Sequence, residues 1–488
     1  MDGIPERAKS CESGCTIRGM DGSFGISIDR GGRLSLSEQI ADGIRAAIRE
    51  GRLPPGARLP SWNDLATQLG VARGTVRSAY ESLADGQFVI AAGAAGTRVA
   101  KRPPTSRIVP EPAKGKESFG PFPGGATSPL PFQLGVPATD LFPAALWSRK
   151  LAQAARDAIA VPTGYPDAAG EPGLRAEIAG YLAVARGLAC RPAQVFVTQG
   201  YAGAFSLVMR MIRAHGSKAW VEDPGYPFAR TALGWSGVEA VGVPVDRDGL
   251  DVAAGIAKAP DVAFALVTAG QQAPLGHTMS LERRHALLDW AAGRRWIVED
   301  DFLGELQLVR RAAPALASMD ARRVLHIGSF SKTMSPSLRM GFLVVPMDLV
   351  DAATQVAGTL EPAPPPVVQM ALESFLHEGH YLRHLRRMKR AYAERREAVM
   401  GALAARSFAC EASGLSVRLP LADGVDDGAL AREAMAVGLS PVPLSPWFVS
   451  DAMRCSGLLL GVTNVPVDRA TAHVNALLDV LARRGVRP

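Results

Sequence analysis

The hydrophobic pattern near the amino terminus predicts three helices followed by a pair of short strands. From Leu36 to Glu50 apolar positions recur at helical spacing, and the Gly- and Pro-rich run 51–56 ends this helix. A second helix begins after Ser61, whose hydroxyl can cap it, and runs to Gly70. Arg73–Leu83 has the pattern of a third helix, and the segment FVIAAGAAGTRVA after it has the pattern of two strands around a turn. This order is typical of a winged helix-turn-helix.

The chain from about Leu134 onward alternates helical stretches with short apolar strands. The segments with strand character are VFVT, AWVED, AFALVT, RWIVEDD, VLHIGSF and MGFLVVP. Such alternation is typical of an open α/β sheet with helical crossovers. The predicted fold class is therefore an α+β winged helix-turn-helix joined to an α/β domain.

These changes of pattern divide the 488 residues into four parts. We predict a disordered tail over 1–32, the winged helix over 33–102 and the α/β domain over 132–488. Residues 103–131 contain eight prolines and four glycines, a composition that predicts a linker rather than a packed element.

Charge is concentrated in the winged helix. The whole chain has a formal net charge of +7, and residues 30–102 alone hold eleven Arg or Lys against six Asp or Glu. Basic surfaces of this kind bind nucleic acid by displacing counterions from phosphates. Double-stranded DNA is therefore the predicted partner of this domain.

The five cysteines do not form a disulfide framework, and their odd number favours a reducing compartment. Cys11 and Cys15 lie close together without a nearby His or further Cys to complete a zinc site, so no metal is predicted. The sequence shows neither an export signal nor an apolar run that could span a membrane. We expect a cytoplasmic protein.

Six side chains are predicted to contact DNA. They are Arg73, Thr75 and Arg77 on the third helix, Arg58 and Ser61 just ahead of the second helix, and Arg98 on the wing. Guanidinium groups suit guanine edges and phosphates, and a helix amino terminus can receive a phosphate. For Arg45, Arg49 and Arg52 solvent exposure is the simpler interpretation. The run GRLPPGARLPSWNDLATQLGVARGTVRSAYESL resembles the GntR family of winged-helix regulators.

The segment IGSFSKTMSPSLRMGFLVVP carries the chemistry of the α/β domain. A lysine that forms a Schiff base needs hydroxyls and an arginine nearby to hold a cofactor phosphate. Ser329, Ser331, Lys332 and Arg339 supply that set directly after an apolar strand.

Companion segments complete a predicted site for pyridoxal 5'-phosphate. WIVEDDF offers Asp300 as partner of the pyridinium nitrogen, and VEDPGYPFAR offers Tyr226 to stack on the ring. VTQGYAG opens a helix, so the backbone N–H groups of Tyr201 and Ala202 can bind the phosphate. GYPDAAGEPGLR and QQAPLGHTMS occupy the expected places of loops around the same site.

Together these segments resemble fold-type I aminotransferases, and the whole chain resembles the MocR family of GntR-type regulators. The resemblance implies that Lys332 carries pyridoxal phosphate, with Asp300, Tyr226, Ser329, Ser331 and Arg339 in the roles given above. It also implies a homodimer in which Tyr165 reaches the partner's cofactor phosphate.

Two departures concern the cofactor ring. Phe302 stands where the family usually has a tyrosine bonded to the phenolic oxygen, and Ala273 stands where a polar or aromatic residue is usual. Fewer donors to that oxygen favour a protonated Schiff base. Gln271 or Gln272 could supply a donor instead.

A third departure concerns the carboxylate of an amino-acid ligand. Aminotransferases clamp it with an arginine. In RCSGLLLGVTNVP our alignment puts Leu458 at that position, with Arg454 as the alternative. The effector therefore stays open between pyridoxal phosphate itself, an amine and an amino acid.

The leading hypothesis is a regulator whose DNA affinity responds to such a ligand. We predict no catalytic residue and at most residual transaminase activity. The alternatives are an aminotransferase with an accessory DNA-binding domain and a scaffold that no longer binds cofactor.

Overall fold

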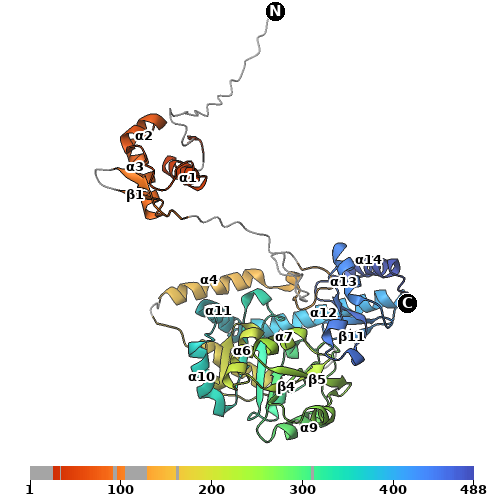
Figure 1. Ribbon diagram of the computed structural model, residues 1–488. Coiled ribbons are helices and arrows are strands. Elements are labelled where there is room, and N and C mark those ends of the chain that lie inside the picture. Colours follow the sequence, from red (N-terminus) through yellow and green to blue (C-terminus); the bar gives the residue numbers. More distant parts are fainter. Residues whose placement is uncertain are drawn as a thin grey trace, which may run out of the picture. The chain divides into compact units, whose positions relative to one another are not determined.

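The computed structural model describes residues 26–32, 34–91, 96–104, 129–160, 164–308 and 313–487. The chain divides into two compact units, Met1–Ser118 and Phe119–Pro488, called the first and the second unit below (Figure 1). Residues 105–128, most of the predicted linker, and residues 1–25 of the predicted tail lie outside the described residues.

The first unit has the predicted order of helices and strands. Its elements are α1 (Leu36–Arg49), α2 (Trp62–Leu69), α3 (Arg73–Asp85), β1 (Val89–Ala91) and β2 (Thr97–Val99). Ser61 caps α2, because its hydroxyl accepts from the backbone N–H of Asp64 at 3.2 Å and donates to Asp64 Oδ2 at 2.7 Å. The antiparallel strands β1 and β2 form the wing, whose tip at 92–95 lies outside the described residues.

The packed part of the first unit begins earlier than the predicted boundary at residue 33. Ile26 is buried in the core of this unit and lies against Gly43 of α1. The backbone of Asp29 exchanges two hydrogen bonds with the Gln39 amide, each 2.8 Å long. Residues 26–32 are therefore part of the fold, because one apolar side chain and two hydrogen bonds attach them to α1.

The second unit is built on an eight-stranded mixed sheet. In spatial order its strands are β3 (Val195–Thr198), β10 (Gly341–Val344), β9 (Val324–Ser329), β8 (Trp296–Asp300), β7 (Phe264–Val267), β4 (Lys218–Asp223), β5 (Glu239–Asp246) and β6 (Gly249–Leu250). Strands β9, β8, β7, β4 and β5 are parallel, and β3 runs with them because both β3 and β9 are antiparallel to β10. The carboxyl ends of these strands therefore share one edge.

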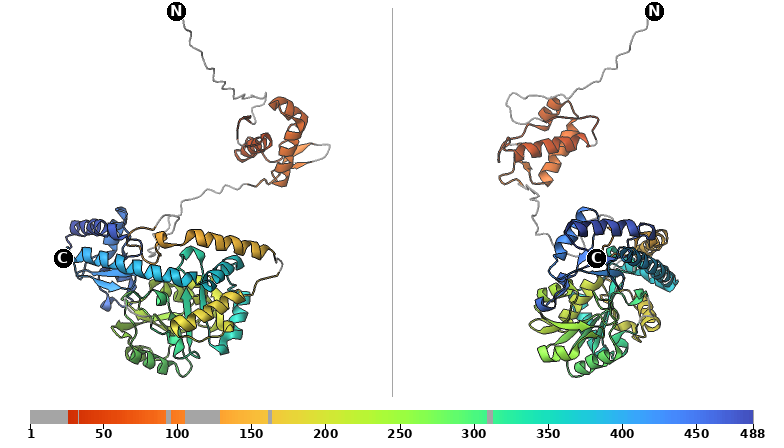
Figure 2. Two further views of the ribbon diagram at one scale, coloured as in Figure 1. Left: turned by 180° about the vertical axis from the view of Figure 1, so that it is seen from behind. Right: turned by 90° about the vertical axis from the view of Figure 1, so that its right-hand side faces the viewer.

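Helices cover both faces of this sheet (Figure 2). They are α4 (Ala144–Ala160), α5 (Pro172–Arg186), α6 (Gly200–Met211), α7 (Pro227–Trp235), α8 (Val252–Lys258), α9 (Leu281–Ala291), α10 (Val350–Thr359) and α11 (Pro366–His377). Successive strand residues face opposite cores: Val195 and Val197 belong to one buried cluster and Phe196 to the other. Burial on both faces explains why the strands are apolar throughout and were recognisable in the sequence.

The long helix α12 (His380–Ala404) leads from the large sheet to a small antiparallel one. The small sheet has the order β11 (Glu411–Ser413), β12 (Ser416–Pro420), β14 (Gly457–Gly461) and β13 (Val442–Pro443), with helices α13 (Asp427–Ala436) and α14 (Ala470–Arg483). Side chains of α12, α13 and α14 pack on this sheet in a core of its own. Across the described ranges, no helix combines the length and apolar character that crossing a membrane requires.

Candidate functional site

A cavity of about 1140 Å³ opens at the carboxyl edge of the large sheet. Every residue predicted to hold the cofactor, except Tyr165, lines it. These residues are Tyr201, Ala202, Tyr226, Asp300, Ser329, Ser331, Lys332 and Arg339. They converge because they lie at or just beyond the ends of β3, β4, β8, β9 and the turn before β10, which is where α/β sheets bind ligands.

Lys332 lies in the turn after β9 with its side chain partly buried. Its Nζ donates a hydrogen bond to the carbonyl of Gly135 at 2.7 Å. Burial lowers the pKa of Lys332 to about 8, and the charge of Asp300 opposes this shift. The amine therefore loses its proton more readily than an exposed lysine does, as a nucleophilic lysine requires.

Asp300 is the last residue of β8 and is 7% exposed. Burial raises its pKa to about 8; the nearby Asp301 and Glu222 raise it further, and Lys332 opposes them. A cation placed beside this carboxyl would reverse the shift. The environment therefore suits a residue that pairs with a positively charged ring nitrogen.

Two tyrosines stand in the cavity beside Asp300. Tyr226 precedes α7 and Tyr201 lies in the first turn of α6, with ring centroids 6.1 Å apart and planes at 76°. The Tyr201 hydroxyl and Gln271 Oε1 are buried without a hydrogen-bond partner in the part of the chain described here, and both residues line the cavity. Such atoms fit a polar group bound in the cavity. The sequence analysis used only the Tyr201 backbone and missed its side chain.

Groups suited to an anion meet at the amino terminus of α6. Gly200, the first residue of this helix, has φ +69°, a conformation that favours glycine. The Arg339 guanidinium carbon lies 3.7 Å from where a Gly200 Cβ would stand, and its Nη2 donates to the carbonyl of Gln199 at 3.3 Å. The hydroxyl of Ser329 accepts from the Ser331 N–H at 3.2 Å. A dianionic phosphate suits this set of donors.

Tyr165 is fully exposed and does not line the cavity of its own chain. Its predicted role toward a partner stays a prediction.

Two residues of β14 line the cavity, Leu459 and Gly461, and Leu459 is one position beyond the predicted Leu458. Leu458 is buried in the core of the small sheet, because neighbouring strand residues point to opposite faces. Arg454 forms an ion pair with Asp451 at 2.5 Å, its side chain is 48% exposed, and it does not line the cavity. Neither Leu458 nor Arg454 therefore lines the cavity.

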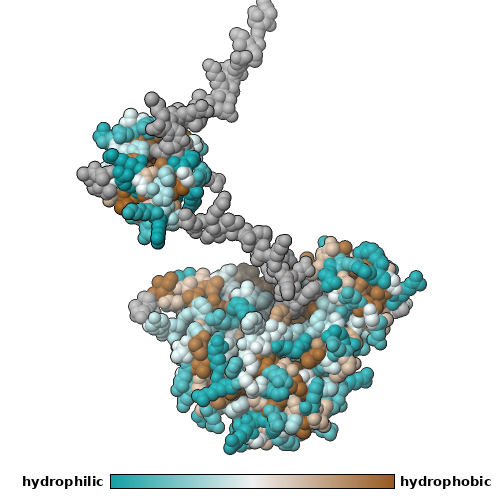
Figure 3. Space-filling view, in the orientation of Figure 1, coloured by the Kyte–Doolittle hydropathy of each residue, from teal (hydrophilic) through white to brown (hydrophobic). Residues whose placement is uncertain are grey.

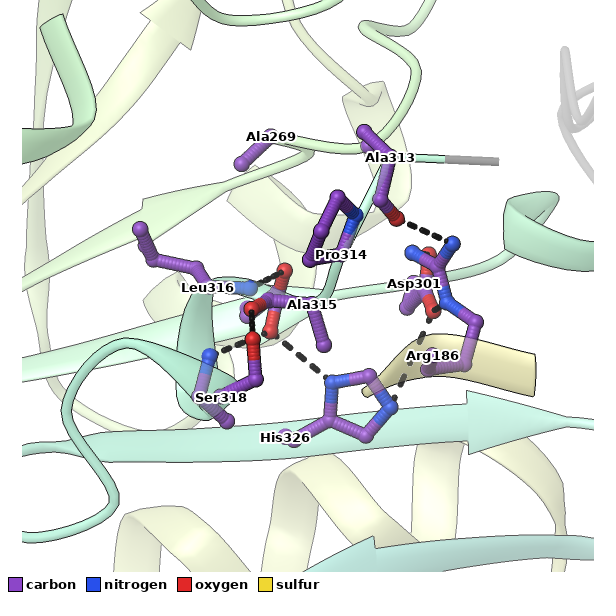
Figure 4. A network of polar contacts seen from close by, with 12 residues as sticks. Arg186, Ala269, Asp301, Ala313, Pro314, Ala315, Leu316, Ser318 and His326 are labelled. Carbon is purple, nitrogen blue, oxygen red and sulfur yellow. Dashed lines mark hydrogen bonds and ion pairs between the residues drawn. The ribbon is translucent and has the colours of Figure 1, made fainter. Parts of the chain in front are cut away.

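A buried polar network joins Arg186, Asp301 and His326 (Figure 4). Asp301 accepts two hydrogen bonds from Arg186, at 2.8 and 2.9 Å. Glu299 accepts from His326 Nδ1 at 2.9 Å and from the N–H of Leu316 at 2.7 Å. These two carboxylates flank Asp300 in the sequence and do not line the cavity, so Asp300 is the acidic residue of this strand end that does. No pattern in the sequence indicated this network.

In the first unit the residues predicted to contact DNA are exposed, except for the partly buried Thr75. Arg98 Nη1 donates to the carbonyl of Gly56 at 3.0 Å, and Arg58 lies against Gly96 beside it. The Ser61 hydroxyl is engaged in its helix cap. These contacts hold the side chains in place around the wing.

Arg77 has two partners within the first unit. Its Nε lies 2.8 Å from Glu81 Oε1, and its guanidinium lies 5.7 Å from the ring centroid of Trp62. Trp62 is 48% exposed at the start of α2 and was not singled out in the sequence analysis. The ring and the carboxylate restrict Arg77 before any DNA arrives.

Among the described residues no group of three or more His, Cys, Asp or Glu could hold a metal ion. Cys190, Cys410 and Cys455 are free thiols, and Cys11 and Cys15 lie outside the described residues.

Known protein families match both units. Residues 36–99 match the family "Bacterial regulatory proteins, gntR family", and residues 135–420 match "Aminotransferase class I and II". The chain is 34% identical over 473 residues to the probable rhizopine catabolism regulatory protein MocR of Rhizobium meliloti, and the match covers 93% of this chain and 95% of that protein.

The chain is also similar to a second regulator and to an aminotransferase of known structure. Over 370 residues it is 34% identical to the pyridoxine biosynthesis transcriptional regulator PdxR of Corynebacterium glutamicum, covering 76% of this chain and 79% of that one. The solved structure of LysN from Thermus thermophilus, an α-aminoadipate aminotransferase complexed with N-(5'-phosphopyridoxyl)-L-leucine, has a TM-score of 0.65 and 28% identity, covering 72% of this chain and 93% of that one.

Proposed function

The chain belongs to the MocR-type regulators of the GntR family, which join a winged helix to an aminotransferase-like domain, and on that premise we propose that its affinity for DNA responds to pyridoxal phosphate, or to an amine that reacts with it, at Lys332. It is a transcription regulator whose GntR domain implies DNA binding. The observation that carries the proposal is the convergence of an amine, a buried carboxyl and an anion cradle on one cavity.

The chain's own residues fit the cofactor. Lys332 would hold it covalently, Asp300 would pair with its ring nitrogen, and Tyr226 would stack on its ring. The Tyr201 and Ala202 N–H groups, with the Ser329 and Ser331 hydroxyls and Arg339, would hold its phosphate. Pyridoxal phosphate supplies an aldehyde that condenses with primary amines. The Tyr201 hydroxyl and Gln271 oxygen, which have no hydrogen-bond partner among the described residues, support this fit.

A ligand changes DNA affinity only if it favours one arrangement of the winged helices over another. A homodimer would contain two DNA-binding domains, so a ligand could favour one arrangement of the two over another. The exposed Ile159 and Tyr165, on and after α4, support an interface there. Figure 3 shows apolar residues on the outward surface of this helix. In this dimer Tyr165 would reach the partner's cofactor phosphate.

The six residues Arg58, Ser61, Arg73, Thr75, Arg77 and Arg98 would form the DNA-binding surface. Their exposure, together with the GntR match over residues 36–99, supports this assignment.

Spectroscopy and DNA binding on the same full-length protein test the proposal. We expect pyridoxal phosphate to give a visible absorbance band that Lys332→Ala abolishes. Binding to the chain's own upstream DNA should change on adding the cofactor or candidate amines to the wild-type protein and not to this variant. No band in either protein would leave the second unit a scaffold without cofactor. Multiple-turnover transamination with unchanged DNA binding would make the chain an aminotransferase instead.

A further inference from the structure

Apolar side chains form one continuous wall of the cavity. Ala273, Phe302, Trp447 and Leu459 all line the cavity and pack in one cluster, which we call the apolar wall. Two of these, Phe302 and Ala273, are positions at which the sequence departs from the family it resembles, and Leu459 is the neighbour of the third predicted departure, Leu458. Two of the departures and the β14 side chain beside the third therefore belong to one feature of the structure.

The charged residues among the described lining residues are Asp300, Lys332 and Arg339. The proposed function assigns all three to the cofactor, to its ring nitrogen, aldehyde and phosphate. No described lining cation then remains for the carboxylate of a second ligand.

Arginines close to the wall do not supply such a cation. Arg230 donates to the carbonyls of Trp447 and Pro446, each at 2.6 Å, and Arg396 donates to the carbonyl of Gly414 at 3.1 Å. Neither lines the cavity. Their guanidinium groups hold backbone segments in place instead.

We propose, on the basis of the proposed function, that the ligand sensed beside Lys332 is a primary amine with an uncharged, mainly apolar body and without a carboxylate. A buried carboxylate without a cationic partner loses its hydration and gains nothing in return, whereas the apolar wall favours a hydrocarbon body. The cavity of about 1140 Å³ exceeds the roughly 300–1,000 Å³ of common small-molecule pockets, so it has room for the cofactor and a second molecule.

The test compares 2-phenylethylamine with phenylalanine, which differ only by a carboxylate. Each is titrated calorimetrically into the full-length protein loaded with pyridoxal phosphate, and the shift in melting temperature gives a second measurement. We expect the amine to bind at least about 30-fold more tightly, in line with the cost of an unsatisfied buried polar group. Ethanolamine, which has a polar body, should bind more weakly than 2-phenylethylamine.

Substitutions at Leu459 reverse the preference. Leu459→Arg should reduce the advantage of the amine at least about tenfold, because a guanidinium can pair with a carboxylate. Leu459→Gln is the matched control, since it adds polarity without charge and should not recover phenylalanine binding. Arg454→Ala should leave both affinities unchanged, because this side chain lies outside the cavity. The comparison of the two ligands on the wild-type protein holds even if a Leu459 variant fails to fold.

Equal or tighter binding of phenylalanine by a protein that shows the cofactor band overturns the inference and leaves the proposed function intact. Tighter binding of ethanolamine than of 2-phenylethylamine overturns it as well. Absence of the cofactor band, by contrast, is a failure of the proposed function itself.

Discussion

The two units hold their functional side chains in opposite surroundings. In the first unit Arg77 and its partner Glu81 have side chains that are 62% and 60% exposed. In the second unit Asp300 is 7% exposed, and burial moves the pKa values of Asp300 and Lys332 to about 8. The exposed charges of the first unit are accessible to phosphates from solvent. The protonation of the buried groups in the second unit depends instead on the side chains packed around them. Substitutions should therefore affect binding in the first unit, and both stability and protonation in the second.

The largest effect should follow from Asp301→Ala. This change leaves Arg186, one of the largest fully buried side chains, without its carboxylate partner. We expect the free energy of unfolding of the second unit to fall by about 3–5 kcal/mol, as for other broken buried ion pairs. Urea unfolding of the full chain followed by fluorescence measures it. Arg73→Ala in the first unit is the control and should change stability by less than about 0.5 kcal/mol; equal losses would contradict the comparison.

Asp300→Asn tests whether the buried carboxyl of the second unit makes folding stability depend on pH. In the cofactor-free protein Asp300 has a pKa of about 8, against about 3.9 for an unfolded chain. The folded protein therefore keeps a proton that the unfolded chain releases, and this group makes stability fall as pH rises from about 4 to about 8.

The Asp300→Asn variant cannot titrate at this position. It should be more stable than the wild type at pH 8, by at least about 2 kcal/mol, and the difference should vanish near pH 4. Unfolding free energies at several pH values measure this. Pyridoxal phosphate should flatten the wild-type profile, because its ring cation favours the carboxylate; a pH-independent difference would refute this assignment.

Arg73→Ala tests the exposed side of the comparison. If Arg73 reads bases, the variant should lose about 1–3 kcal/mol of affinity for the operator and discriminate less between sequences. Quantitative footprinting at fixed salt measures both. Uniform weakening on all sequences would instead identify Arg73 as a phosphate contact.

Trp62→Ala should have the smallest effect. It removes the ring beside Arg77 without touching the guanidinium, so we expect a loss of about 0.5–1 kcal/mol in DNA binding. A double-mutant cycle with Arg77→Ala separates the two roles of the ring. If Trp62 acts through Arg77, it adds nothing in the Arg77→Ala background; an undiminished loss there would mean that the indole contacts DNA itself.

Local signals explain what the sequence could predict. The helix caps, the wing and the lysine turn each depend on residues a few positions apart, so their patterns are readable along the chain. The buried strands were recognisable because both of their faces are apolar. The convergence of Ser329, Ser331 and Arg339 on one cavity was likewise predictable, since they lie on one short segment.

Contacts between distant segments could not be predicted. Arg186 and Asp301 are 115 positions apart in the sequence and form their ion pair only in the folded chain. The sequence analysis placed Leu458 at the site, whereas the neighbouring Leu459 lines the cavity, because an all-apolar strand gives no alternation from which to tell which face a residue takes. Ile26 was assigned to a tail because a single buried side chain leaves no periodicity.

The hydrogen bond from Lys332 to the Gly135 carbonyl joins the lysine turn after β9 to the segment that precedes α4. Gly135 belongs to a stretch that starts at Pro129, lines the cavity and continues the chain directly after residues 105–128. A ligand that binds the Lys332 amine would break its hydrogen bond to the Gly135 carbonyl. This hydrogen bond lies only a few positions beyond Pro129, where the described part of the second unit begins.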